Sequence, residues 1–231
     1  MPRTGDEPDT HSRRPLLADA AITILARDGG RGLTHRAVDR QANVPEGTTK
    51  NYYATRQAIL EAAAHRMAQQ HRAAVDHLRA TTPTGATPTQ LRQLYPALVR
   101  RADRDPTQTL AMVELYLEAV RHPEVRAALA TMATTNAHAT AGLHHAAGVP
   151  SDTTHTGLLD AYLLGVLLTR LALPGDTLTT TGLDDPDTVG TGLFDATTPT
   201  TPQPREHPTL SIVCHPRNAN RRQPVTYSHG R

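Results

Sequence analysis

Several residue types are scarce in this sequence of 231 residues, and each shortage narrows what the chain can be. Cysteine occurs once, at Cys214, which excludes an intramolecular disulfide framework and a cysteine-cluster zinc site. Tryptophan is absent, phenylalanine occurs once, and hydrophobic residues make up 38%, below the roughly 45–50% of typical domains. Either part of the chain is therefore unfolded, or its core is rich in alanine.

Long apolar runs are also missing. The N-terminus has no apolar stretch of the length that a signal peptide needs. The longest apolar segment, residues 158–173, is short for a membrane span and contains Asp160 and Arg170. We therefore expect a cytoplasmic protein with no membrane partner.

Sequence patterns typical of enzymes and metal sites are absent. There is no glycine-rich phosphate loop, no nucleophile elbow and no pair of carboxylates at catalytic spacing. Of the 13 histidines, His65, His71 and His77 recur every six residues, which spreads them around a helix instead of along one face. We expect no catalytic residue, no cofactor and no metal ligand.

Lysine is the scarcest charged residue, and its position is informative. Lys50 is the only lysine, so all the others of the 24 Lys and Arg residues are arginine. Residues 1–80 hold 12 basic and 9 acidic side chains, residues 81–174 hold 7 of each, and residues 175–231 hold 5 and 6. The small basic excess lies in the part that contains Lys50, which agrees with a nucleic-acid partner for that part.

Apolar residues recur at helical spacing before residue 174, and no convincing strand pattern interrupts them, so we predict an all-α fold. The chain divides into a flexible arm (1–12), a three-helix domain (13–60), a second helical domain (61–174) and a mostly disordered tail (175–231). In the tail, residues 185–197 hold at most one or two weak helical turns, and residues 209–214 are β-prone. Residues 80–90 have the composition of a linker. The predicted helices are 15–28, 35–42, 46–51, 55–78, 91–102, 107–121, 123–147 and 156–173.

Two short helices joined by a tight break are the pattern on which the functional prediction depends. The helices at 35–42 and 46–51 flank Asn43 and Val44, an arrangement typical of a helix-turn-helix motif. Asn43 suits the left-handed backbone that the turn requires, and Val44 closes the corner with an apolar side chain. Pro45 is expected to start the second helix of the pair. Thr34 and Thr55 are placed to cap the helices that follow them.

The predicted helix at 46–51 is almost free of apolar side chains. A solvated surface turn would look the same in isolation, but the flanking break and helices favour DNA recognition. Lysine bonds guanine, asparagine bonds adenine, and threonine contacts phosphate or a thymine methyl. Of Tyr52 and Tyr53, we expect one to reach a phosphate and the other to close the small core. The predicted DNA contacts are Thr34, Arg36, Glu46, Thr48, Thr49, Lys50, Asn51, Tyr52 and Arg56.

Residues 15–65 resemble the DNA-binding domain of the TetR family of bacterial transcription regulators, and the GTTKNYY segment is similar to a variant of actinobacterial members. Asn43 stands where the family usually has glycine, Pro45 where it has serine, and Lys50 where it has a phosphate-contacting tyrosine. Phosphate and base contacts are therefore expected to be redistributed. The resemblance rests on Ala20, Ala21, residues 30–34, Val38, Ala42, Val44, Gly47, Thr48, Tyr53, Arg56, Ile59 and Leu60.

This resemblance implies a function as well as a fold. Family members are all-helical homodimers whose second domain, here residues 61–174, holds a ligand pocket and a dimer interface. It implies a repressor that binds a palindromic operator on double-stranded DNA as a homodimer and is released by a small-molecule effector. Residues 158–173 are apolar nearly all round, so we expect them in the dimer interface or in an ordinary core.

Adaptable side chains in the second domain are candidates for the effector pocket. We predict Met112, Tyr116, Met132 and Asn136 as ligand-binding residues, with ordinary core packing as the alternative for the apolar ones. A second function remains open, namely a helical ligand-binding or enzymatic protein whose helix-turn-helix module no longer reads DNA.

Overall fold

The computed structural model describes residues 10–81 and 87–198. This part of the chain is all-α, as predicted, with eleven helices and no strand. The helices are α1 (Thr10–Gly32), α2 (His35–Gln41), α3 (Thr48–Tyr52), α4 (Arg56–Thr81), α5 (Pro88–Arg92), α6 (Leu94–Arg104), α7 (Thr107–Arg121), α8 (Pro123–Ala146), α9 (Thr153–Ala172), α10 (Gly175–Thr181) and α11 (Pro186–Thr197). None of these helices is long and apolar enough to cross a membrane.

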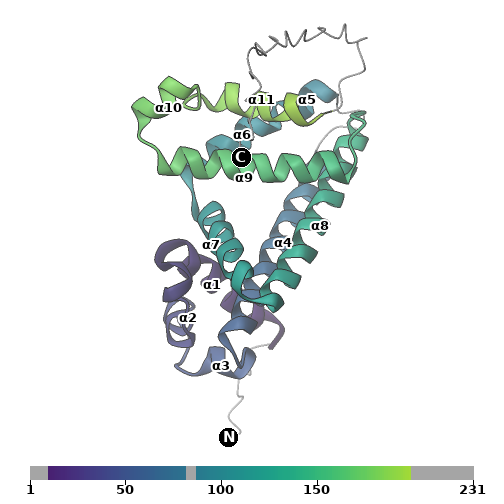
Figure 1. The fold of residues 1–231 in the computed structure, drawn as a ribbon. Coiled ribbons are helices and arrows are strands. Elements are labelled where there is room, and N and C mark those ends of the chain that lie inside the picture. The colour runs from purple at the N-terminus through teal and green to yellow at the C-terminus, as the bar shows by residue number, and fades with distance from the viewer. Residues whose placement is uncertain (1–9, 82–86, 199–231) are drawn as a thin grey trace, which may run out of the picture. The chain divides into compact units, whose positions relative to one another are not determined.

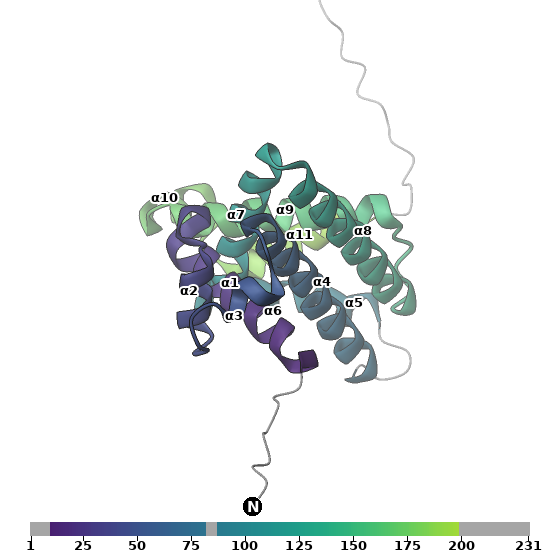
Figure 2. The ribbon, with the colours of Figure 1, turned by 90° about the horizontal axis from the view of Figure 1, so that it is seen from below.

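Helices α1 to α3 lie at one end of the described part, and α9, α10 and α11 lie at the other (Figure 1). Helices α4, α7 and α8 run between the two ends, and α4 packs against α8. Figure 2 looks from below onto the end that carries α1, α2 and α3. Because α4 is one continuous helix, it crosses the domain boundary predicted at residues 60–61.

Two hydrophobic cores hold these helices together. The N-terminal core joins α1, α2, α4, α7 and α8, and its fully buried alanines, such as Ala21 and Ala63, allow the helices to approach closely. The C-terminal core joins α5, α6, α9 and α11 to the far ends of α4 and α8, around Tyr95 and Phe194. The N-terminal core is thus rich in alanine, which fits the scarcity of large apolar residues such as phenylalanine.

Local capping accounts for where several helices begin. The Oγ1 atoms of Thr34 and Thr55 accept hydrogen bonds from the amides of Ala37 and Ala58, each at 3.1 Å, which confirms both predicted caps. Helix α1 begins at Thr10, five residues before its predicted start at Pro15, so the predicted arm is shorter. Residues 1–9 lie outside the described part.

The prediction of a mostly disordered tail was wrong for residues 175–197, because this segment contains α10 and α11. Asp185 caps α11 by accepting from the amides of Asp187 and Thr188, and Val189, Leu193 and Phe194 are buried in the C-terminal core. The predicted linker at 80–90 is shorter too, because α4 extends to Thr81 and α5 begins at Pro88. Residues 199–231, which include the β-prone run at 209–214, lie outside the described part.

Candidate nucleic-acid interface and effector region

The turn between α2 and α3 has the backbone that the sequence predicts. Asn43 has a φ of 52°, in the left-handed region, and it is the non-glycine residue with positive φ in the described part. The Val44 amide donates to the Asp39 carbonyl at 3.0 Å, which closes the turn against α2. Helix α3 begins at Thr48, two residues later than predicted, because Pro45 lies in the turn and Gly47 caps the helix with a φ of 89°.

Asp39, which the sequence analysis did not select, holds α3 in place. Its carboxylate accepts from the Gly47 amide at 2.8 Å, from the Thr49 amide at 2.7 Å and from the Thr49 hydroxyl at 2.5 Å. Only 2% of Asp39 is exposed. Gly47 has no side chain to cap α3, so the carboxylate of α2 does so, and its negative charge suits a helix N-terminus.

At Thr49 the structure differs from the predicted DNA contact. Its side chain is fully buried and its hydroxyl is committed to Asp39, so it faces α2 and not solvent. The neighbouring Lys50 and Asn51 are exposed, whereas Thr48 and Tyr52 are partly buried. The Thr48 hydroxyl donates to the Pro45 carbonyl at 2.6 Å.

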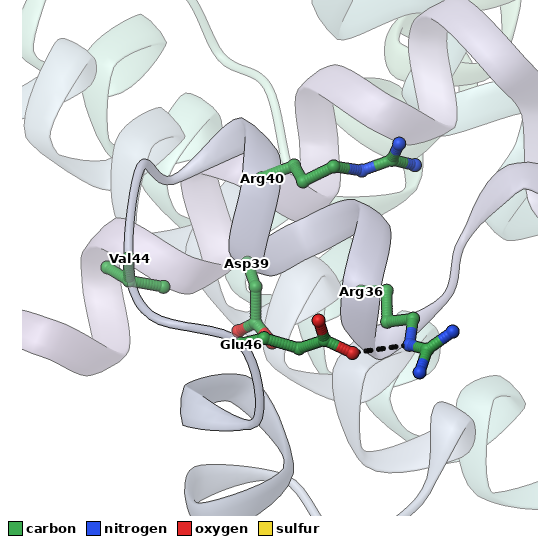
Figure 3. Close-up of a pocket in the computed structure, with 5 residues that line it drawn as sticks. All are labelled: Arg36, Asp39, Arg40, Val44 and Glu46. Carbon is green, nitrogen blue, oxygen red and sulfur yellow. Dashed lines mark ion pairs between the residues drawn. The ribbon is translucent and has the colours of Figure 1, made fainter.

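Arg36 and Glu46 form an exposed ion pair beside α3. The Arg36 Nε lies 2.6 Å from Glu46 Oε1, and the two side chains are 81% and 67% exposed. They line a hollow of about 450 Å³ with Asp39, Arg40 and Val44, shown in Figure 3. Thr34, the cap of α2, is exposed as well.

Tyr53 closes the small core, as predicted for one of the two tyrosines. Its ring is buried, and its hydroxyl donates to the Arg14 carbonyl at 3.2 Å. The exposed Arg14 guanidinium lies 5.7 Å from the ring centroid of Tyr52 and 5.5 Å from that of Tyr53. Arg14 thus adds a cation next to α3. The sequence signal for it was the Arg13-Arg14 pair before Pro15.

At Arg56 the structure also differs from the predicted phosphate contact. Its guanidinium donates to both carboxylate oxygens of Glu118 and to the Gly30 carbonyl. Hydrogen bonding to Glu118 raises the pKa of Arg56, and the same bond lowers the pKa of Glu118. The side chain is therefore directed at α1 and α7 instead of at a ligand.

The four predicted effector residues lie on α7 and α8 and differ in their surroundings. Met132 is buried in the N-terminal core, and Met112 packs against the same core. Tyr116 is 44% exposed. Asn136 is partly buried, and its Oδ1 has no hydrogen-bond partner within the described residues.

Asp160 of α9 is a further polar group in this region that the sequence analysis did not select. It makes no ion pair or hydrogen bond to any described residue, and burial raises its pKa to about 6. Burial also raises the pKa of Tyr116 on α7 and of Tyr95 on α6, and the nearby charge of Asp160 adds to both shifts. Asp160 is therefore close enough to each tyrosine to affect its pKa, in the region where α9 packs against α6 and α7.

A buried hydrogen-bonded chain lies in the C-terminal core. The Tyr95 hydroxyl lies 2.5 Å from His144 Nε2, and His144 Nδ1 lies 2.9 Å from Ser151 Oγ. Burial lowers the pKa of His144 to about 4, so the ring is neutral at physiological pH. Within the residues that the structure describes, no group of three His, Cys, Asp or Glu side chains is placed to hold a metal ion.

Comparison with known proteins points to one family. Residues 86–196 match the family described as the tetracyclin repressor-like C-terminal domain. A solved member of the TetR family from Streptomyces coelicolor A3 is 26% identical, with a TM-score of 0.58 over 81% of this chain and 99% of that chain. The chain is thus similar to the TetR family in the sequence of its second domain and in its fold over most of its length. The resemblance noted at residues 15–65 is thereby confirmed, and it extends to the second domain.

Two further TetR-type relatives are informative. The HTH-type transcriptional regulator BetI of Rhizobium meliloti (strain 1021) is 32% identical over 130 residues, which cover 54% of this chain and 60% of that protein. The multidrug binding protein EbrR, solved in complex with ethidium, is 25% identical, with a TM-score of 0.57 over 81% of this chain and 99% of that chain. The chain thus spans less than two thirds of the BetI relative.

Proposed function

We propose that this protein is a ligand-responsive DNA-binding transcription regulator of the TetR family, namely a repressor that binds a palindromic operator as a homodimer. The observation that carries the proposal is the construction of α3. Its buried side, through Thr49, is fixed to Asp39, and its outer side presents Lys50 and Asn51 to solvent. A short, rigidly held helix with polar outer residues suits the major groove.

The cations around α3 fit contacts to the DNA backbone. Arg14 and Arg36 are exposed near the ends of α3 and α2, and phosphate contacts of this kind position a recognition helix without reading sequence. We therefore keep Thr34, Arg36, Glu46, Thr48, Lys50, Asn51 and Tyr52 as the proposed DNA contacts, add Arg14, and omit Thr49 and Arg56.

A second copy of the chain is the proposed partner of α9. Its outer face exposes Leu158, Tyr162 and Leu168, and a Cβ atom added at Gly165 would meet no neighbouring atom. An apolar helix face with open space at a glycine fits close packing against another helix. The two copies would present their α3 helices to successive half-sites, with centres roughly 34–36 Å apart or a multiple of that.

The proposed effector is a small molecule that carries a positive charge. The relative EbrR has been solved with ethidium and with proflavin, which are both aromatic cations. In the present chain Asp160, a carboxylate without an ion-pair partner in the described part, lies near the Tyr116 and Tyr95 rings. A carboxylate beside aromatic rings suits such a ligand. Met112, Met132 and Asn136 stay candidates for the pocket wall.

The test is binding of the full-length protein to a fluorescent duplex taken from upstream of its own coding region. We expect specific binding by a dimer whose affinity falls steeply as the salt concentration rises, because phosphate contacts release counterions. A single half-site should bind much more weakly than the palindrome. If wild-type protein binds no duplex specifically but still binds a cationic dye, the alternative of a ligand-binding protein that does not read DNA would replace this proposal.

A further inference from the structure

Three helices meet at one backbone position, Gly30, near the end of α1. The Gly30 amide donates to Glu114 Oε2 of α7 at 2.8 Å, and its carbonyl accepts from Arg56 Nη2 of α4. Arg56 in turn binds Glu118 of α7, with Nη1–Oε2 at 3.0 Å and Nη2–Oε1 at 2.7 Å. We call Gly30, Arg56, Glu114 and Glu118 the α1–α4–α7 junction.

The junction requires a glycine at position 30 for reasons of space. A Cβ atom there would lie 2.2 Å from Glu118 Oε1 and 3.2 Å from Arg56 Nη2, so a methyl group would displace the ion pair. The regular part of α1 ends one residue earlier, at Gly29, whose φ is 69°. The chain thus exposes bare backbone at the point where α7 approaches, and the acidic side chains of α7 bind it.

The charges of the junction favour a fixed geometry more than they favour stability. The Glu118 side chain is 11% exposed and that of Arg56 is 33% exposed, so both lose hydration when they pair. Such loss offsets much of the attraction between buried ions, whereas a two-point guanidinium–carboxylate contact fixes both distance and angle. His122 Nε2, 3.4 Å from Glu118 Oε2, adds a further contact at the end of α7.

A second ion pair in the same helices provides a natural contrast. Arg66 of α4 donates to Asp19 of α1, with Nε–Oδ1 at 2.7 Å and Nη2–Oδ2 at 2.9 Å. It has the same two-point geometry and joins α1 to α4. It reaches α7 only indirectly, through Gln70, which donates to Asp19 at 2.8 Å and accepts from Gln108 of α7 at 3.1 Å. The α1–α4 packing therefore has an ion pair of its own, and the junction adds a direct ion-pair connection to α7.

Helix α7 carries the candidate effector residue Tyr116 two positions before Glu118. Two residues correspond to about 200° around a helix, so the two side chains leave α7 on opposite sides. One side of α7 thus contacts the module that bears α3, and the other lies near Asp160.

We propose that Arg56, Glu114 and Glu118 are positioning residues, which fix the orientation of α1–α3 on α7 and so set the half-site spacing that the dimer accepts. The proposal rests on the proposed function, because it concerns operator binding. A displacement of α7 passes to α3 through this junction, and loss of the junction frees the orientation of α3 without changing the side chains that contact DNA.

The experiment compares Glu118→Gln with the matched control Asp19→Asn in the full-length protein. Affinity is measured for the wild-type operator, for operators with one base pair added or removed between half-sites, and for random DNA. For Glu118→Gln we expect affinity at the natural spacing to fall about tenfold and the preference for that spacing to be lost. Affinity for random DNA should stay unchanged. Asp19→Asn should keep the spacing preference even if its thermal stability falls.

A second measurement does not depend on DNA. Spin labels at Arg40→Cys on α2 and Ala130→Cys on α8, in a Cys214→Ser background, report the distance between the α1–α3 module and α8. The distribution should broaden in Glu118→Gln and stay narrow in Asp19→Asn. Unchanged spacing preference and unchanged distances in Glu118→Gln would overturn the inference. Absence of operator binding by the wild type would instead refute the proposed function, and the distances would still decide whether the junction fixes the module.

Discussion

Two aspartates, the buried Asp39 and the partly buried Asp160, have opposite environments in this fold. Asp39 accepts three hydrogen bonds from the start of α3, so its charge is compensated where it lies. Asp160 has no ion pair or hydrogen bond to the residues described, and burial raises its pKa to about 6. The first carboxylate therefore stabilises local structure, whereas the second destabilises it at neutral pH. An uncompensated charge of this kind fits the ligand-binding role proposed above for Asp160.

The largest effect that separates the two is expected from Asp39→Ala. The change leaves the Gly47 amide, the Thr49 amide and the Thr49 hydroxyl without their acceptor, and each buried unsatisfied donor costs about 1–3 kcal/mol. We expect the free energy of unfolding to fall by about 2–4 kcal/mol and specific DNA binding to be lost. Urea denaturation and duplex binding measure both. Wild-type operator affinity in this variant would show that α3 does not depend on Asp39.

Asp160→Asn should have the opposite sign. Because the pKa of Asp160 is raised, the folded state binds more protons than the unfolded state between about pH 4 and pH 6, so this aspartate lowers stability as pH rises through that window. Removing the charge should stabilise the fold by about 1–3 kcal/mol at pH 7.5 and by almost nothing below pH 4.

The measurement for Asp160→Asn is thermal melting at both pH values, together with titration with ethidium. We expect ethidium binding to weaken while operator affinity without ligand is kept. A variant that is less stable than wild type at pH 7.5, or that binds ethidium as tightly, would remove the distinction between the two aspartates.

Lys50→Ala tests the surface that Asp39 supports. If Lys50 makes a good base contact, its loss should cost about 1–3 kcal/mol at the preferred operator and much less on random DNA. Arg101→Ala on α6, another exposed cation far along the chain, is the matched control and should change neither affinity. Equal losses on operator and random DNA would mean that Lys50 binds phosphate without reading bases.

The smallest effect is expected from Glu46→Gln. Glu46 pairs with the exposed Arg36, and exposed pairs contribute about 0–1 kcal/mol, so stability should barely change. Freed from this pair, Arg36 becomes available to phosphate, and the salt dependence of DNA binding should steepen by about one phosphate contact. A shallower salt slope would indicate that Glu46 itself contacts a base.

Features set by neighbouring residues could be predicted from the sequence, and features set by distant partners could not. Asn43 at the turn and the caps Thr34 and Thr55 depend on nearby backbone, and all three predictions are confirmed. The sequence predicts a phosphate contact for Arg56 because nothing near it reveals its partner. That partner, Glu118, lies 62 positions away. The sequence pattern alone predicts that Thr49 is exposed. In the structure its hydroxyl donates to Asp39 and the side chain is buried.

Helix α11 shows why composition misled the prediction of the tail. Its threonines and glycines are typical of disordered segments, yet Val189, Leu193 and Phe194 fall on one side and meet a core built from α5 and α6. In the sequence, Asp160 carries information only as a charge that argues against a membrane span. Nothing in its local sequence indicates that its helix, α9, packs against α6 and α7.

The contact between α11 and α6 should constrain which residue related sequences carry at position 190. A Cβ atom at Gly190 would lie 2.3 Å from the Pro96 nitrogen and 2.6 Å from its Cα, so backbone meets backbone there. A Cβ atom added at Gly192, two residues later, would meet no atom within 4 Å. Among related sequences in which these helices cross in the same way, position 190 should therefore remain glycine, while position 192 drifts to other residues. The contrast between two neighbouring glycines would let a sequence alignment reveal an ordered C-terminal helix that composition conceals.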